Sequence, residues 1–528
     1  MRAPSGPRSG SRSGPRPAAR RALRHARPLT NAPDDLGPAL RAARGGGACA
    51  ARQPRRTQSH RAALMLNASS RTTLLWIVAT AFFMQSVDTT IVNTALPSIA
   101  RALDQDALSM HGVVTAYTLT MATLTPASGW LADRFGTRRV FFAAIVVFAL
   151  GSLCCAAAAS ATQLIVARVL QGVGGSMLLP IGRLAVLRGV PGDEYVAALA
   201  FVSTFGQIGP ILGPTLGGWL TQSMSWYWVF LVNLPICAVG LAAVHRYMPR
   251  DKPTDPPPFD YTGYTLLSIA MIAGSLAIDA LSDGGYADWT AGMIAIAAAA
   301  AITYVAYAHW RPNPIFRLKL FREPNFAVGL AGNLVSRIGI GATPFLLPLM
   351  MQLEFGYSPL RSGLMLVPAA IAGVIAKPWI APLVRRYGYR TFLFVNTLIV
   401  GAVIALFAAI GPDTPLVVEL ALIAIFGAIN SIQIAAMNSV TLKSLPHRDA
   451  ASGNSLYSMV QMLSMGLGAS VGSGLTSLFG AQTGSSLLGF KLSFVCVGAV
   501  TLASAAIFRR VQDPRVTRTQ PGHAVAQR

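Results

Sequence analysis

GWLADRFGTRR, at residues 129–139, is a short charged stretch between two long apolar runs. It holds one acid and three arginines in a chain of 528 residues that is 53% hydrophobic and only 12% charged. Soluble domains carry about 25% charged residues, so this composition argues against a soluble enzyme. The apolar runs are about 20 residues long, which is the length that crosses a hydrocarbon core of about 30 Å as a helix. The stretch therefore predicts a hairpin between two helices of an all-α polytopic membrane protein.

Charged, Pro and Gly breaks divide the apolar sequence into segments of transmembrane length. Fourteen transmembrane helices are predicted, at residues 72–97, 108–131, 138–158, 162–187, 196–221, 226–247, 261–281, 290–310, 325–352, 360–384, 391–411, 415–440, 453–479 and 487–509.

Lys and Arg are distributed very unevenly over the loops between these segments. One set of alternate loops, together with the C-terminal tail, holds 21 of them, and the opposite set holds only Arg101, Arg361 and Lys491. Basic residues in short loops stay on the cytoplasmic side, so both termini are expected to be cytoplasmic. The hairpin at 129–139 then lies in the cytoplasm, between the second and third spans.

The net charge of +23 is concentrated in the loops and at the N-terminus. Residues 1–64 hold fourteen arginines and two acids, with almost no bulky apolar residue. Such a segment cannot build a core, and it lacks the apolar middle of a signal peptide. It is interpreted as a disordered cytoplasmic tail, as a basic arm for anionic lipid, or as sequence upstream of a start at Met65, which we favour. This charge distribution predicts a lipid bilayer as partner and no nucleic acid.

The second half of the chain contains a weaker copy of the opening stretch, APLVRRYGYRTF at residues 381–392. Both copies share a Leu, an Arg, an aromatic residue, a Gly and an Arg. A repeat at corresponding places in two halves indicates a duplicated transporter. Arg385 stands where the first copy has Asp133, so the acid has no counterpart in the second copy.

Further motifs resemble those of a known family. They are VDTTIVNTALP (87–97), RVLQGVGGS (168–176), GQIGPILGPTLGGWL (206–220), WYWVFLVNLP (226–235) and SGNSLYSMVQMLSMGLG (452–468). Together with GWLADRFGTRR they resemble the fourteen-span drug:proton antiporter branch of the major facilitator superfamily, and within it the MdtD-like multidrug resistance proteins. The resemblance covers residues 70–510.

This resemblance implies a major facilitator fold with two six-helix bundles, at 70–247 and 325–509. Two inserted spans at 248–310 connect the bundles, and 510–528 forms a cytoplasmic tail. The implied function is proton-coupled export of small organic compounds, such as multidrug efflux, by alternating access in the bacterial inner membrane. A monomer is expected, and assembly with a periplasmic adaptor and outer-membrane channel is left open.

No catalytic constellation competes with this interpretation. The seven histidines are scattered and there is no phosphate-binding loop. The cysteines show no ligand spacing, so we expect no enzyme activity, cofactor, metal site or disulfide. They are Cys49, Cys154, Cys155, Cys237 and Cys496.

The hairpin motif suggests both orientation and gating. Its candidate residues are Gly129, Asp133, Arg134, Gly136, Arg138 and Arg139. We expect the two glycines to permit close backbone approach and a tight turn. Asp133 is expected near a helix N-terminus or an arginine across the bundle interface, as a contact that breaks between states. The arginines are interpreted either as part of that contact or only as anchors of the cytoplasmic side.

Asp88 and Arg168 are the candidate proton-coupling residues. Counting about 1.5 Å per residue along each span places them at similar depth, about 24 Å and about 20 Å from the cytoplasm. Charged residues in a span are usually functional, so an ion pair with a titrating carboxylate is the leading hypothesis. A static structural pair is the alternative.

The fifth span carries small residues at helical spacing. They are Gly206, Gly209, Pro210, Gly213, Pro214, Gly217 and Gly218. Small residues allow close helix packing and prolines bend the helix, which predicts a seam between the bundles that seals against proton leak.

The candidate substrate cavity is more basic than acidic. Its candidate residues are Asn93, Gln171, Arg337, Lys377 and Gln461. Asp88 and Asp279 are taken as the acids within the spans, against Arg168, Arg183, Arg337 and Lys377. This balance favours neutral or anionic solutes over lipophilic cations. The alternatives are an exporter of anionic metabolites or chelates, and a proton-independent facilitator or importer on the same fold.

Overall fold

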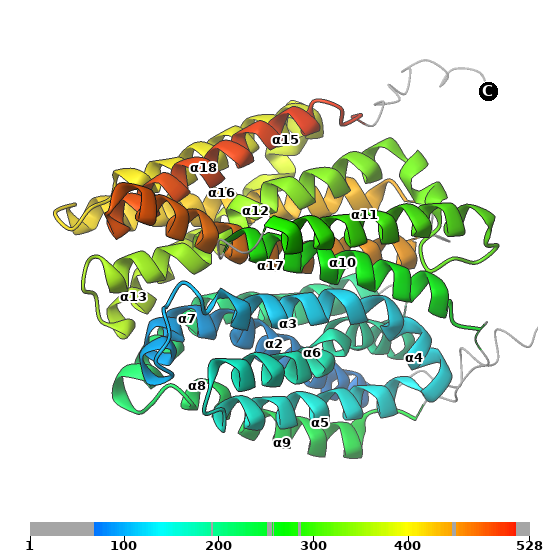
Figure 1. The fold of residues 1–528 in the computed structure, drawn as a ribbon. Helices are drawn as coiled ribbons and strands as arrows, with labels where there is room; N and C mark the ends of the chain where they lie inside the picture. The colour runs from blue at the N-terminus through cyan, green and yellow to red at the C-terminus, as the bar shows by residue number, and fades with distance from the viewer. Residues whose placement is uncertain are drawn as a thin grey trace, which may run out of the picture. The chain divides into compact units, whose positions relative to one another are not determined.

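The structure, a computed structural model, describes residues 68–513 apart from 192–193, 251–255, 257, 283–286 and 446–449. Every regular element in these ranges is helical (Figure 1). A helix satisfies its own backbone N–H and C=O groups, which hydrocarbon cannot do, so apolar segments of this length fold as helices. The prediction of an all-α membrane protein is confirmed. The segment predicted at 1–64 and most of the tail lie outside the described residues.

All fourteen predicted segments contain helix, but two regions differ from the prediction. The segment at 108–131 is interrupted by a 3-10 turn, η2 (Thr125–Ala127), because Pro126 offers no N–H for the helical ladder. Residues 359–409 form one nearly continuous helical stretch instead of two separate ones. Within the described residues, twelve helices are long and apolar enough to cross a membrane. The count of fourteen crossings and the cytoplasmic termini stay predictions.

The helices of the first half gather in one group (Figure 1). They are α2 (Ala68–Ala102), α3 (His111–Leu124), α4 (Ser128–Phe135), α5 (Thr137–Ala156), α6 (Ala161–Gly189), α7 (Tyr195–Ser223), α8 (Trp228–Leu231) and α9 (Asn233–Tyr247). Helix α2 contacts α6, α7 and α9, and so forms the centre of this group.

The helices of the last part of the chain form a second group. They are α12 (Pro324–Leu353), α13 (Pro359–Met365), α14 (Val367–Ala376), α15 (Ile380–Leu406), α16 (Leu416–Lys443), α17 (Ala450–Thr483) and α18 (Ser486–Phe508), with the 3-10 turns η3 (Leu318–Arg322), η4 (Lys377–Trp379) and η5 (Phe407–Ala409).

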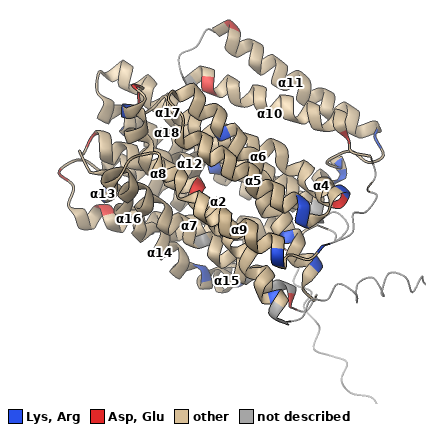
Figure 2. Cartoon of the chain, turned by 90° about the horizontal axis from the view of Figure 1, so that it is seen from below, with Lys and Arg blue, Asp and Glu red and all other residues tan. Residues whose placement is uncertain are grey.

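Helices α10 (Tyr261–Ser282) and α11 (Ala287–Trp310) pair with each other at the edge of the bundle (Figure 2). Only 22% and 17% of their apolar windows are buried, against 61% for α2 and 72% for α12. Helix α10 contacts both α3 and α17, one helix from each group. The inserted pair therefore lies at the periphery, and its helix α10 contacts both helix groups where they meet.

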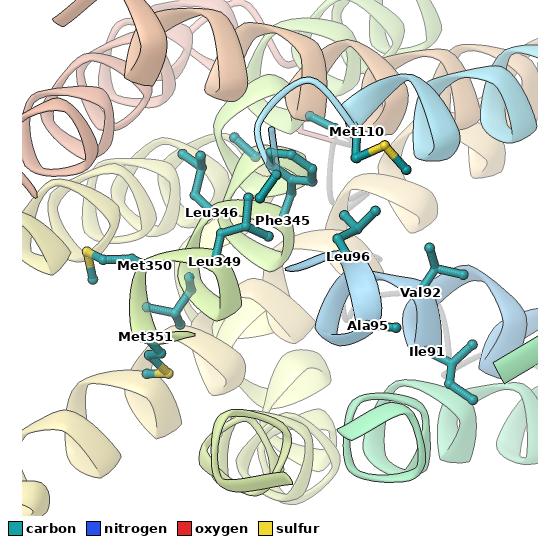
Figure 3. Close-up of a cluster of buried hydrophobic side chains, with 14 of the residues drawn as sticks. Ile91, Val92, Ala95, Leu96, Met110, Phe345, Leu346, Leu349, Met350 and Met351 are labelled. Carbon is teal, nitrogen blue, oxygen red and sulfur yellow. The ribbon is translucent and has the colours of Figure 1, made fainter. Parts of the chain in front are cut away.

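The larger hydrophobic core shared by the two groups lies at the end predicted to face outward. Figure 3 shows this cluster, in which Ile91, Val92, Ala95 and Leu96 of α2 lie with Phe345, Leu346, Leu349 and Met350 of α12. At the predicted cytoplasmic end the first group has its own core around Phe141 and Val244. The second group has another around Phe392 and Phe508. A smaller cluster joins the groups there, along α3 and α17.

The two copies of the hairpin motif share a backbone feature. Gly136 has a φ of 88° and Gly388 has a φ of 75°, and both stand where one helix ends and the next begins. This left-handed conformation strains any residue with a Cβ atom, which explains a glycine at the same place in both copies. In Figure 2, Lys and Arg are prominent near α4, which contains residues 129–135 of the first copy.

Candidate functional site

Asp88 lies on α2 and is completely buried, with 0% of its surface exposed. Its Oδ2 accepts a hydrogen bond of 2.9 Å from Nη1 of Arg168 on α6. Its Oδ1 accepts from Nε2 of Gln171 at 2.8 Å and from Nδ2 of Asn233 at 2.9 Å. The carboxylate is thus held by side chains of two other helices, α6 and α9.

Arg168 is also buried, and its guanidinium has partners besides Asp88. Its Nε donates to the backbone carbonyl of Val113 at 3.2 Å, and its Nη1 donates to Oε1 of Gln171 at 2.6 Å. The guanidinium lies 4.0 Å from the ring centroid of Tyr117. A buried ion pair survives only when further hydrogen bonds satisfy both ions, and this network supplies them.

The structure therefore brings together the two residues that the sequence paired, and adds others. Gln171, expected in the substrate cavity, belongs to this network instead, and its Nε2 also lies 2.8 Å from Oγ of Ser152. Asn233 was missed. The signal for it was a polar side chain in the otherwise apolar stretch WVFLVNLP.

The hairpin residues form contacts within the first helix group. Asp133 forms an ion pair with Arg188, at the end of α6, and Arg188 also donates to Oγ1 of Thr137 at 2.7 Å. Arg138 donates to the backbone carbonyl of His245. Asp133 was expected to contact a helix N-terminus or an arginine across the bundle interface, but its partner is an arginine of the same helix group. Arg134 and Arg139 are exposed.

Gly129 differs from the prediction. A Cβ atom at Gly129 would meet no heavy atom of the described residues within 4 Å, so the expected close approach there is wrong. Gly136 does make the tight turn, because of its positive φ.

The acid missing from the second hairpin is supplied by a distant part of the chain. Asp513 accepts hydrogen bonds from the backbone N–H groups of Tyr389, at 2.6 Å, and Arg390, at 3.2 Å. It lies beside Gly388, where a Cβ atom would be 2.6 Å from its Oδ2. Arg385 is exposed.

The glycines of the fifth span mostly face α2 rather than the second helix group. Cβ atoms at Gly209, Gly213 and Gly217 would lie 2.5, 2.1 and 2.4 Å from atoms of α2, whereas the nearest neighbour at Gly206 is Phe82 at 3.6 Å. The expected seam between bundles is therefore wrong for these positions. They pack α7 against α2, its neighbour within the same group.

Gly218 is the exception, because it contacts the second group. A Cβ atom there would lie 2.2 Å from the carbonyl oxygen of Pro359 on α13. In return, a Cβ atom at Gly363 of α13 would lie 2.3 Å from the carbonyl oxygen of Pro214. The two helices thus meet backbone to backbone across the groups.

A cavity of about 530 Å³ lies between the two helix groups. From the first group it is lined by α2 and α7, including Thr90, Asn93, Pro210 and Pro214, and from the second by α12, α14 and α16. Lys377 lies on its wall, near the predicted cytoplasmic end. No acid stands among the described residues that line it.

Of the five expected cavity residues, Asn93 and Lys377 are among these lining residues. Arg337 is buried 97% and its Nε donates to Oδ1 of Asn333 at 2.5 Å, away from the cavity lining. Gln461 is half-buried and is also absent from the lining. Asn430 and Asn438 of α16 also line the cavity and were missed, because the sequence does not show which face of this helix meets the cavity.

Glu419 corrects the list of acids within the spans. It lies in the first turn of α16, inside the segment predicted at 415–440, and is completely buried. The hydroxyl of Tyr357 lies 3.2 Å from both of its carboxylate oxygens. Burial and then the neighbouring carboxylate raise the pKa of Tyr357, while Arg361 opposes this shift.

The structure has helices long and apolar enough to cross a membrane and a cavity between two helix groups. Helix α2, which lines this cavity, also carries a buried ion pair. Together these features define a polytopic membrane transporter. The chain belongs to the Major Facilitator Superfamily, whose family model matches residues 78–469. Proteins called "Putative multidrug resistance protein MdtD" in Salmonella heidelberg (strain SL476) and Salmonella typhimurium (strain LT2) are 44% identical over 450 residues. These alignments cover 83% of this chain and 94% of each relative. The predicted resemblance to the superfamily and to MdtD is confirmed.

Solved structures share the fold at low sequence identity. A crystal structure of the peptide transporter POT in complex with sulfate matches with a TM-score of 0.65 at 15% identity, covering 85% of this chain and 96% of that one. A bacterial homologue of the human lysosomal transporter Spinster, inward-facing and unoccupied, matches with a TM-score of 0.60 at 14% identity. That match covers 84% of this chain and 97% of the other.

Proposed function

We propose that this transporter is a secondary active antiporter of the bacterial inner membrane, which moves protons inward and a small organic solute outward. It would work as a single chain by alternating access. The names of the MdtD relatives support multidrug efflux as its role.

The single observation that carries the proposal is the placement of Asp88 on α2. On one side of this helix, a fully buried carboxylate is held by α6 and α9. On the same helix, Thr90 and Asn93 line the cavity between the groups. One helix thus connects a site that can bind a proton with a site that can bind a solute.

Protonation of Asp88 would remove the negative charge that α2 offers to Arg168. The ion pair between α2 and α6 would weaken, and α2 could then move with Thr90 and Asn93 relative to the second helix group. If the proton and the solute bind preferentially to different positions of α2, binding of one favours release of the other, because both shift the equilibrium between these positions. This coupling would exchange protons for solute.

Lys377 favours neutral or anionic solutes. It carries the positive charge of the cavity, and the described lining residues include no acid to balance it. Export of anionic metabolites or chelates is therefore the second candidate function. A lipophilic cation would meet an unfavourable charge at this wall.

The experiment is uphill transport in everted membrane vesicles with an imposed pH gradient, using a panel of cationic, neutral and anionic fluorescent compounds. Asp88→Asn keeps the size of the side chain and removes its titration. We expect this variant to exchange solute down its gradient but not to concentrate it. Asp288→Asn, at an exposed acid in the first turn of α11, is the control and should transport normally.

Full uphill transport by Asp88→Asn would refute the role of this carboxylate. Downhill transport that is unaffected when a protonophore collapses the gradient, without any uphill transport, would instead favour the proton-independent facilitator. Abundance in the membrane is measured alongside, so that loss of folding is separated from loss of coupling.

A further inference from the structure

His111 and Asp279 form a second pair of titratable side chains, distinct from the pair of Asp88 and Arg168. His111 is the first residue of α3, and only 4% of its side chain is exposed. Asp279 lies near the end of α10, with 22% of its side chain exposed. Nε2 of His111 lies 3.5 Å from Oδ1 of Asp279.

The other ring nitrogen determines which tautomer the neutral imidazole of His111 adopts. Nδ1 of His111 lies 3.0 Å from the backbone carbonyl oxygen of Leu108. A carbonyl oxygen only accepts hydrogen bonds, so Nδ1 must carry a proton. In the neutral imidazole, Nε2 is then an acceptor, and it faces the carboxylate oxygen of Asp279, which is also an acceptor.

Two acceptors that face each other need a proton between them. Oδ1 of Asp279 is buried and has no hydrogen-bond partner. One added proton would turn Nε2–H into a donor to this oxygen and would place a positive ring beside a negative carboxylate. We propose that His111 and Asp279 form a proton-binding site at the predicted outer end of the protein, and that its occupancy holds the outer side closed.

The position of the pair explains the link to closure. The carbonyl of Leu108 also accepts a 2.7 Å hydrogen bond from Oγ of Ser473, on α17 of the second helix group. Next to it, Oγ1 of Thr115 lies 3.0 Å from Oγ of Ser470. The proton site thus stands where α3, α10 and α17 meet, and a tighter contact between α3 and α10 would stabilise this junction.

Among the described residues, charged groups near His111 lie on α10, on α6 and in the loop before α3. Asp279 faces it from α10, and α6 contributes Arg168, which bonds the carbonyl of Val113 two residues further along α3. Asp104 and Asp106 are exposed in the preceding loop. Helix α17 carries no Asp, Glu, Lys, Arg or His. Because Arg168 also binds Asp88, the first turn of α3 connects the outer site to the proposed coupling site.

The test measures the outer junction directly and needs no known solute. Spin labels at Gln105→Cys and Gln482→Cys, both exposed, report the distance across the junction in a background without the native cysteines. Double electron–electron resonance is recorded in lipid nanodiscs at about pH 5.5 and about pH 8, on either side of the ordinary histidine pKa of about 6.5.

In the wild-type background we expect the closed population to grow at least about fivefold relative to the open one at the lower pH, as for a typical coupling between sites. His111→Gln and Asp279→Asn each supply an amide donor between the two helices without titrating. Both should be closed at both pH values. His309→Gln, at an exposed histidine of α11, is the matched control and should respond like the wild type.

The proposal would be overturned if the distance between the labels in the wild-type background did not change with pH. It would also be overturned if both His111→Gln and Asp279→Asn kept the pH response of the wild type. The outcome is separate from the proposed proton exchange at Asp88, which is judged from uphill transport. Asp88→Asn should keep the pH response of the outer junction, even when it no longer concentrates solute.

Discussion

At the scale of single residues, the buried pair of Asp88 and Arg168 shows how charged groups are accommodated in a helical membrane protein. Each ion is satisfied by neutral polar groups as well as by the other, including Gln171 and the carbonyl of Val113. Removing one ion leaves the other buried and unbalanced, whereas removing both leaves only neutral groups.

Arg168→Gln alone is therefore expected to lower the free energy of unfolding by about 3–5 kcal/mol. The double variant Asp88→Asn with Arg168→Gln should lose less than the sum of the two single variants, with a coupling of about 0.5–3 kcal/mol. Unfolding of the purified protein in detergent, followed by tryptophan fluorescence, gives all four values of this cycle. Strictly additive losses would show that the two side chains do not interact.

At the scale of elements, the hairpin at 129–139 and its copy at 381–392 have the same backbone turn, but a different acid forms the contacts of each hairpin. Both turn at a glycine with positive φ. In the first, Asp133 binds the side chain of Arg188, whereas in the second, Asp513 accepts from backbone N–H groups. In the first hairpin, a side-chain ion pair thus joins the turn to the end of α6.

We propose that the pair of Asp133 and Arg188 acts in gating, by holding the hairpin to α6 in one state. Asp133→Asn removes the charge but keeps the size. Exposed ion pairs contribute about 0–1 kcal/mol to stability, so abundance in the membrane should stay normal. Transport in everted vesicles should fall, while Asp413→Asn, at an exposed acid of another loop, should leave it unchanged. Wild-type transport, or abundance that falls in step with transport, would exclude the gating role.

At the scale of the whole molecule, the two helix groups are joined at the predicted outer end and share less at the other. The shared core contains residues of α2 and α12 (Figure 3). Hydrogen bonds reinforce it, since Nε2 of Gln352 donates to the carbonyl of Thr94 at 3.0 Å. The cavity reaches from this core toward Lys377. We infer that the structure represents an outward-closed state, in which the solute site is reached from the cytoplasm.

Gly218 and Gly363 should be essential to this closed state. Gly363→Ala would place a Cβ atom 2.3 Å from the carbonyl oxygen of Pro214, so α7 and α13 must separate. Overpacking of this kind costs about 1–3 kcal/mol, which would shift the outer junction toward its open form by about 5- to 150-fold. The distance between labels at Gln105→Cys and Gln482→Cys reports the shift. Gly129→Ala, where a Cβ atom meets open space, should leave the distance unchanged.

Much of the fold was predictable from local sequence. The apolar runs predict helices, because a chain in hydrocarbon must satisfy its backbone polar groups within each segment. All fourteen segments contain helix for this reason, and the interruption at Pro126 also has a local cause, although it was not predicted. Asp88 and Arg168 could be paired because depth along a span follows from residue count, and charges within spans are rare.

Tertiary structure alone decided which side chains meet around each helix. The rotation of α6 turns Gln171 toward Asp88 rather than toward the cavity, and the rotation of α7 turns three of its glycines toward α2. The distant Asp513 reaches the second hairpin only because the chain end folds back beside α15. Residue count gives depth along a span but not the direction in which a side chain points. That direction follows from the mutual packing of all the helices, and it determines the network around Asp88, the cavity lining and the junction at His111.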